Sequence, residues 1–190
     1  MVKNIVIFAS GGGSNASKII THLKNNPNVK VALILSNNID ANVLNIAKNN
    51  NIATHVVDRE SFYKSDNVVK LLKRLDIDLI VLAGFLWLIP KDLIMAFPDR
   101  ILNIHPALLP KYGGKGMYGQ NIHKAVFEAK EKESGITIHL VNEKYDEGKI
   151  IFQAHCDLSK TRNAEEIGKK VLELEHKYYP LVVENYLDRV

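Results

Sequence analysis

Two patterns of hydrophobic and polar positions alternate along the first hundred residues. Short runs of branched apolar residues such as IVIF and LIVL are continuous, which is typical of strands buried on both faces of a parallel sheet. These runs predict strands over residues 3–9, 29–36, 53–57, 79–83 and 101–104. Between them, helical spacing predicts helices over residues 15–24, 41–49, 60–75 and 91–96. The order predicts an α/β fold with a Rossmann-like, doubly wound, mostly parallel sheet.

The pattern changes after Gly116. A helix is expected over residues 121–129, followed by two apolar runs, ITIHLV and IIFQAH, that flank NEKYDEGK. These runs predict a hairpin or bulged antiparallel pair at the sheet edge. A C-terminal helix over residues 164–187 should pack back through apolar side chains at helical spacing, namely Ile167, Val171, Leu174, Tyr178, Leu181 and Val182. The sequence contains no repeat or linker, so residues 1–190 are expected to form a single domain.

Composition narrows the class of protein. The net charge of +4 is mild, and the lysines are interleaved with acids, so we expect no nucleic-acid partner. The first apolar run is too short for a signal peptide or a membrane span, and we expect no membrane association. Cys156 is the only cysteine, which excludes an internal disulfide and favours a reducing compartment. A cytoplasmic protein is therefore expected.

A glycine-rich stretch, SGGGSN, lies between the first strand and the first helix. Its site candidates are Gly11, Gly12, Gly13, Ser14 and Asn15. Glycines permit a tight turn, and the free N–H groups of a helix N-terminus favour an anion. A dinucleotide fold would also place an acid at the end of the second strand, but that strand ends LILSNN. We therefore favour a phosphate monoester, while a dinucleotide and a purely structural turn remain alternatives.

The run NIHP places two polar residues at the carboxyl end of a predicted strand, where α/β sheets bind their ligands. Asn103 and His105 share one face of that strand because side chains alternate with a period of two. An amide can stabilise an oxyanion, and an imidazole can exchange a proton. Asp146 is the best-placed carboxylate to orient the ring, and His139 is a further possible member. No metal is expected, since no close ligand spacing supports one.

Five segments, SGGGSN, VLAGFLWLIP, NIHPALLPKYGGKG, GITIHLV and YDEGKIIFQ, occur in an order that carries a resemblance. Over nearly the whole chain the sequence resembles the phosphoribosylglycinamide formyltransferases, which are folate-dependent enzymes of purine (IMP) biosynthesis. The resemblance implies transfer of the formyl group of 10-formyltetrahydrofolate, a co-substrate, to the amine of 5′-phosphoribosylglycinamide. It also implies that residues 1–100 form a nucleotide-phosphate half and residues 101–190 a catalytic and folate-binding half.

The resemblance also implies roles for individual residues. Asn103, His105 and Asp146 match the catalytic trio of the family, in which protonated His105 would stabilise the oxyanion and Asp146 would raise the pKa of the imidazole and order a proton-relaying water. Gly11 to Asn15 match its phosphate loop, and Glu175 matches a ribose-binding carboxylate. The walls of the folate pocket would be Phe85, Leu86, Trp87, Leu88, Ile89, Val141, Asn142, Glu143, Lys144 and Tyr145.

The sequence departs from the family pattern at two places. Trp87 stands where many members have arginine, and GGKGMYGQ replaces a more frequent PGLHTHRQ in a loop, residues 111–119, whose glycines would permit it to act as a lid. Related enzymes that act on tRNA or hydrolyse the folate carry an additional domain, for which 190 residues leave no room. The alternatives are a formyltransferase for another amine, such as a sugar nucleotide, and a non-catalytic phosphoribosyl sensor. A monomer or weak homodimer is expected.

Overall fold

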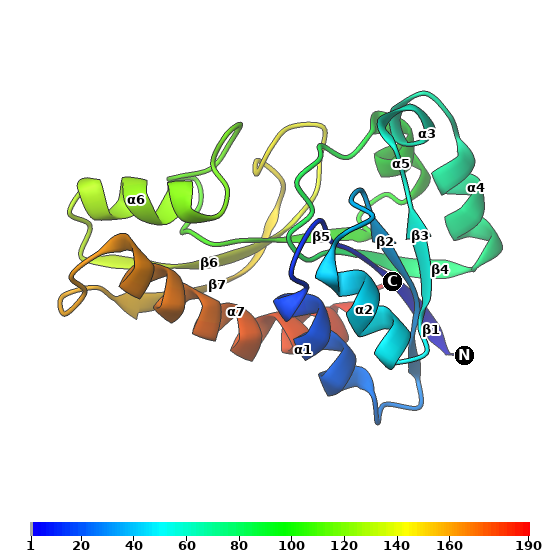
Figure 1. Cartoon of the computed structure of the whole chain (residues 1–190), viewed down its shortest axis with the longest axis horizontal. Coiled ribbons are helices and arrows are strands. Elements are labelled where there is room, and N and C mark those ends of the chain that lie inside the picture. The colour runs from blue at the N-terminus through cyan, green and yellow to red at the C-terminus, as the bar shows by residue number, and fades with distance from the viewer. Residues whose placement is uncertain (1) are drawn as a thin grey trace.

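A computed structural model describes residues 2–190 and contains a seven-stranded sheet in the order β3-β2-β1-β4-β5-β6-β7 (Figure 1). β1 to β5 are parallel to one another, and β6 and β7 are antiparallel to their neighbours. The predicted mostly parallel α/β sheet with an antiparallel pair at one edge is confirmed. The strands are β1 (Lys3–Phe8), β2 (Val29–Ser36), β3 (Ala53–Val56), β4 (Ile77–Leu82), β5 (Ile101–His105), β6 (Glu133–Leu140) and β7 (Ile150–Asp157).

Helices cover both faces of the sheet (Figure 1). They are α1 (Ser14–Leu23), α2 (Asn42–Asn49), α3 (Arg59–Tyr63), α4 (Asn67–Arg74), α5 (Lys91–Ala96), α6 (Gln120–Glu128) and α7 (Ala164–Leu187). Alternate residues of β1 belong to two separate cores: Ile5 and Ile7 pack with α1, α2 and α7, whereas Val6 and Phe8 pack with α3, α4 and α5. This two-sided burial explains why the strand sequences are continuously apolar.

The single helix predicted over residues 60–75 is wrong, because the structure contains two short helices there. Asp58 caps α3 by accepting the Ser61 N–H at 2.7 Å, and the Ser61 hydroxyl reciprocates at the Asp58 N–H. α3 ends at Tyr63, and α4 starts afresh after Asp66. The residues between the two helices are polar and favour turns over helix interiors. The apolar spacing continues across them, which is why the sequence pattern predicted one helix.

The buried face of α7 differs from the predicted one at its C-terminal half. Ile167 and Val171 are buried as expected, but Leu181 is 44% exposed. The buried stripe instead continues at four-residue intervals through Glu175, Tyr179, Val183 and Leu187. The hydroxyl of Tyr179 lies 2.9 Å from the carbonyl oxygen of Leu82 and 3.3 Å from that of Leu102. α7 is therefore fixed to the carboxyl end of β4 and to β5 at the residue that precedes Asn103.

Of the two expected arrangements, a hairpin or a bulged antiparallel pair at the sheet edge, β6 and β7 form an antiparallel pair with one irregularity. Its register shifts between Ile138 and His139, so that His139 pairs with Ile150. On its other side β6 pairs with β5, which sets His139 directly opposite Asn103. Within residues 2–190 the structure has no helix that is both long and apolar enough to cross a bilayer.

Candidate active site

The centre of the candidate site is formed where β5 meets β6. Asn103 and His139 are register partners, and Asn103 Nδ2 lies 3.1 Å from His139 Nε2. His139 Nδ1 donates to the Leu140 carbonyl oxygen at 2.8 Å, which leaves Nε2 as the acceptor for the amide N–H. The second N–H of the amide remains available to a ligand. His139, a possible site member in the sequence, is thus placed in contact with Asn103.

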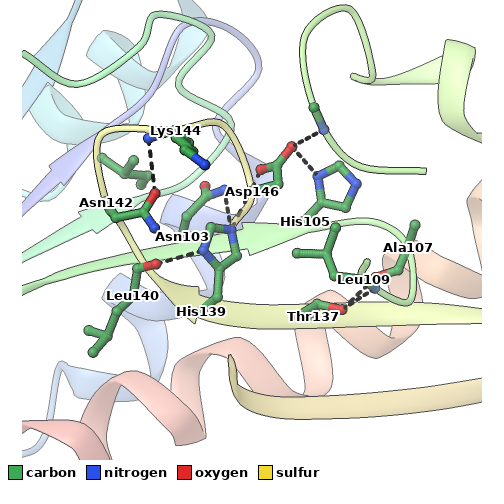
Figure 2. A network of polar contacts seen from close by, with 12 residues as sticks. Asn103, His105, Ala107, Leu109, Thr137, His139, Leu140, Asn142, Lys144 and Asp146 are labelled. Atoms are coloured by element: carbon green, nitrogen blue, oxygen red, sulfur yellow. Dashed lines mark hydrogen bonds and ion pairs between the residues drawn. The ribbon is translucent and has the colours of Figure 1, made fainter. Parts of the chain in front are cut away.

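Asp146 comes from the β6–β7 loop and lies between two histidines (Figure 2). Its Oδ2 lies 3.5 Å from His105 Nδ1, and its Oδ1 lies 3.6 Å from His139 Nε2. The N–H of Gly114 donates to Oδ2 at 3.0 Å, which ties the Asp146 loop to the loop after β5. Residues from three segments thus form one network in which the predicted trio meets, with His139 as a fourth member.

Burial and neighbouring charges shift the pKa values of His105 and Asp146 in opposite directions. Burial lowers the pKa of His105 below its usual value, and the Asp146 charge and the Tyr112 carbonyl raise it back only in part. Burial raises the pKa of Asp146, but the neighbouring His139 and His105 rings and the Gly114 N–H together outweigh it and leave the pKa below its usual value. The expected effect of Asp146 on His105 has the right sign, yet burial is the larger influence. Asp146 is ionised at neutral pH.

A second hydrogen-bond network holds the turn that follows β5 (Figure 2). Thr137 Oγ1 donates to the Ala107 carbonyl at 2.7 Å and accepts the Leu109 N–H at 3.0 Å. Gln153 Nε2 donates to the Leu109 carbonyl at 3.0 Å and to Thr137 Oγ1 at 2.9 Å. β6 and β7 therefore fix the chain immediately beyond His105, which limits the freedom of the catalytic candidates.

A cavity of about 590 Å³ opens over the trio and joins most of the predicted site residues. One wall is the loop after β4, and it is mainly apolar. Trp87 in that loop packs on Phe62 at 5.5 Å between ring centroids, and the Arg59 guanidinium lies 5.2 Å from its ring. From the predicted folate walls the lining includes Phe85, Leu86, Trp87, Leu88, Ile89, Val141, Lys144 and Tyr145, and from the nucleotide side Asn15 and Glu175.

Asn15 and Glu175 form a buried pair at one end of this cavity. Asn15 Nδ2 donates to Glu175 Oε2 at 2.5 Å, joining α1 to α7. Burial raises the pKa of Glu175, and the Asn15 hydrogen bond offsets this only in part. Asn15 Oδ1 is buried and, among residues 2–190, has no hydrogen-bond partner. Because both residues are in the lining of the cavity, they are candidates for contact with a ligand.

Six predicted site residues do not line the cavity. Four of them, Gly11, Gly12, Gly13 and Ser14, form the adjoining turn at the N-terminus of α1. Gly13 has a φ of +75° and lies so close to Val43 that an added Cβ would come within 2.8 Å, so glycine is required there. The other two lie in the loop after β6: Asn142 Oδ1 accepts the Lys144 N–H, and the exposed Glu143 pairs with Lys91 at 3.2 Å.

Comparison with known proteins decides the family. A family model described as Formyl transferase matches residues 3–183. This chain belongs to the formyl transferase family.

Individual relatives carry more specific names. The chain is 43% identical over 187 residues to chloroplastic phosphoribosylglycinamide formyltransferase of Arabidopsis thaliana, covering 95% of this chain and 64% of the relative. It is 34% identical to phosphoribosylglycinamide formyltransferase of Bacillus subtilis, covering 98% and 95%. The crystal structure of phosphoribosylglycinamide formyltransferase from Anaplasma phagocytophilum has a TM-score of 0.88 and 30% identity, and the match covers 98% of this chain and 87% of that one. The chain thus spans less than two thirds of the plant relative.

Some residues of this formyl transferase site were not singled out from the sequence. Lys115, Met117 and Tyr118 line the cavity from the loop between β5 and α6. The sequence of this loop has neither helical nor strand periodicity, so it gave no indication of which side chains face the cavity. Its glycines indicated only that the loop could move. The contact of Arg59 with Trp87 was likewise unforeseen, because it joins α3 to the loop after β4 across more than twenty residues of sequence. Within the described residues, no cluster of three or more His, Cys, Asp or Glu side chains is arranged to hold a metal ion.

Proposed function

We propose that this formyl transferase moves the formyl group of 10-formyltetrahydrofolate to the amine of 5′-phosphoribosylglycinamide, a step of purine biosynthesis. The observation that carries the proposal is the shared cavity. It joins an amide, an imidazole and a carboxylate to an apolar wall on one side and to the Asn15–Glu175 pair on the other. Relatives from plants and bacteria are named for the same reaction.

The two ends of the cavity suit two different ligands. The loop from Phe85 to Ile89 provides an apolar wall and backbone groups, which suit the flat pterin ring of a folate. At the other end, Asn15 Oδ1 and Glu175 can accept hydrogen bonds from ribose hydroxyls. The glycine turn at the start of α1 lies next to Asn15 and would hold the phosphate on its N–H groups. The formyl carbon and the amine would then meet between Asn103 and Asp146.

The chemistry follows from this placement. The neutral amine attacks the formyl carbon, and the carbonyl oxygen becomes an oxyanion. The free N–H of Asn103 and the protonated ring of His105 stabilise that charge. The bond from the carbon to N10 of the folate then breaks, N10 gains a proton, and the attacking nitrogen loses one. Asp146, ionised and 3.5 Å from His105 Nδ1, stabilises the imidazolium and orients a water molecule that relays these protons.

The balance of forces on His105 fits a group that gains and loses a proton in each turnover. Burial favours the neutral ring, while the Tyr112 carbonyl at Nε2 and Asp146 at Nδ1 favour the charged one. A non-catalytic sensor has no need of such a trio. No contact in the cavity favours the sensor or a transferase for another amine over the proposed reaction.

An absorbance assay tests the proposal. Deformylation of a 10-formyl folate analogue is followed with and without 5′-phosphoribosylglycinamide, for the wild-type chain and for His105→Ala. We expect turnover that requires the ribonucleotide and falls by at least about 100-fold in the variant. Turnover without ribonucleotide would indicate a hydrolase, and turnover only with a sugar nucleotide would indicate another acceptor. Either result would refute the proposed reaction.

A further inference from the structure

A feature of the loop after β5 concerns the second nitrogen of the His105 ring. His105 Nε2 lies 2.8 Å from the backbone carbonyl oxygen of Tyr112. The Tyr112 carbonyl and the Asp146 carboxylate both only accept, but the carbonyl is within hydrogen-bond distance, whereas Asp146 Oδ2 lies 3.5 Å from Nδ1, so Nε2 carries the hydrogen of the neutral ring. Nδ1 is then the nitrogen that faces Asp146 and gains or loses the proton. The direction of one backbone carbonyl thus selects the tautomer of the ring.

The backbone of Tyr112 is in an unusual conformation. Its φ is +58°, in the left-handed region that is unfavourable for residues with a Cβ and especially for bulky ones. Such a conformation persists only where surrounding contacts hold it, and strained residues of this kind are concentrated at functional sites. If Tyr112 moved to a common conformation, its carbonyl would turn away from His105.

The contacts that hold Tyr112 lie on the far side of its ring. The hydroxyl donates to Glu131 Oε1 at 3.0 Å, and the Lys111 ammonium donates to the same oxygen at 2.9 Å. Glu131 lies in the turn between α6 and β6, and its side chain is only 26% exposed. One carboxylate therefore ties two consecutive residues of the loop to a fixed point beside the sheet. Both bonds involve charged groups, which makes them stronger than neutral hydrogen bonds.

We infer that Glu131 and Tyr112 are positioning residues for the reaction, which hold the Tyr112 carbonyl against His105 Nε2 and thereby keep Nδ1 as the proton-exchanging nitrogen beside Asp146. The inference rests on the proposed function for its effect on turnover, but its effect on the ring can be observed without any substrate. Neither residue touches the reacting atoms. Both act through His105: the Glu131 carboxylate holds the Tyr112 hydroxyl, and the Tyr112 backbone carbonyl holds the His105 ring.

The test uses Tyr112→Phe, which deletes only the hydroxyl, and Glu131→Gln, which keeps an acceptor oxygen but removes the charge. Tyr186→Phe is the matched control, because it deletes a tyrosine hydroxyl that donates to the Asp99 carbonyl at 2.9 Å. The full chain is labelled with ¹⁵N-histidine, the His105 signals are identified by their loss in His105→Ala, and the tautomer is read from the ring nitrogen shifts without ligand.

We expect wild type and Tyr186→Phe to hold the Nε2–H tautomer, and Tyr112→Phe to give a mixture of both. Turnover of Tyr112→Phe should fall about tenfold at unchanged KM, and Glu131→Gln should fall less. The alkaline limb of the pH profile of Tyr112→Phe should move to lower pH, because the Tyr112 carbonyl raises the pKa of His105 in wild type. The other groups that act on this ring, Asp146, His139 and His123, stay in place in the variant.

The opposite results would overturn the inference. If Tyr112→Phe and Glu131→Gln both keep the wild-type tautomer and pH profile, the two residues serve stability alone, whatever their melting temperatures. If the wild-type ring itself holds the Nδ1–H tautomer, the Tyr112 carbonyl does not select it. If the tautomer shifts as expected while no variant or wild type consumes the ribonucleotide, the positioning role stands and the proposed reaction fails.

Discussion

Replacement of Asp146 by asparagine isolates the contribution of its charge. The side chain keeps its shape, and its oxygen can still accept the Gly114 N–H. Asp146 has a φ of +56°, and asparagine is among the residues that best tolerate the left-handed region. The fold should therefore survive, so that any loss of turnover reports on the missing charge and not on unfolding.

The size of the loss can be worked out from the distance to His105. At an effective dielectric constant of about 20, two unit charges 3.5 Å apart attract each other by about 5 kcal/mol. Both side chains are largely buried, with 4% and 12% of their surface exposed, so little is lost to solvent screening. Because each 1.4 kcal/mol corresponds to about a factor of ten in rate, the upper limit is about 3000-fold. His105 is charged for only part of the cycle, and we expect a loss of about 100- to 3000-fold.

The assay is ribonucleotide-dependent deformylation of the folate analogue under saturating substrates. Glu147→Gln serves as the control, since it removes one negative charge from the same loop while its own partner, Lys144, is at the surface. The control should retain turnover within about twofold. An Asp146→Asn variant that is folded and turns over within tenfold of wild type would show that the carboxylate charge does not stabilise the imidazolium.

Three further outcomes are expected. The pKa of Asp146 is lowered in the folded state, so its carboxylate stabilises the fold at pH values above its unfolded-state pKa, and this stabilisation is lost as the pH falls through the folded-state pKa. In urea unfolding from about pH 5 to pH 2, the free energy of unfolding should therefore fall more steeply for wild type than for Asp146→Asn. The raised pKa of Glu175 means that its ionised form destabilises the fold, so Glu175→Gln should raise the free energy of unfolding at pH 7 yet increase KM for the ribonucleotide; an unchanged KM would contradict its ribose role. Gly148→Ala places a Cβ 1.7 Å from the Leu140 carbonyl and should cost about 3 kcal/mol or more by chemical denaturation, whereas Gly12→Ala, with nothing within 4 Å, should cost little.

The sequence was most informative where a pattern is local. Continuous apolar runs sufficed for the parallel strands, and the alternation along β5 was enough to place Asn103 and His105 on one side. The helix break near Asp66 was missed because the apolar spacing continues across it, whereas the break itself is held by Ser65, whose hydroxyl donates to the Ser61 carbonyl at 2.7 Å and accepts the Asn67 N–H at 3.4 Å. This error concerns a break of three residues between two helices and leaves the fold class unchanged.

What the sequence could not give depends on long-range geometry. His139 meets Asn103 only because of the register between β5 and β6, and the buried stripe of α7 passes through Glu175 and Tyr179, which are polar at their tips. The absence of Asn142 and Glu143 from the cavity lining depends on the course of an irregular loop. The expected monomer or weak homodimer and the cytoplasmic location remain predictions.

The position of α7 in the chain has a consequence for synthesis. Glu175 supplies the carboxyl group that accepts from Asn15, and Tyr179, one turn later, joins the helix to Leu82 of β4 and Leu102 of β5. A chain synthesised only as far as β7 already contains Asn103, His105 and Asp146, but it lacks Glu175, the partner of Asn15. Under the proposed function, such an incomplete chain would hold the chemical groups but only one of the two side chains proposed to bind the ribose of the acceptor.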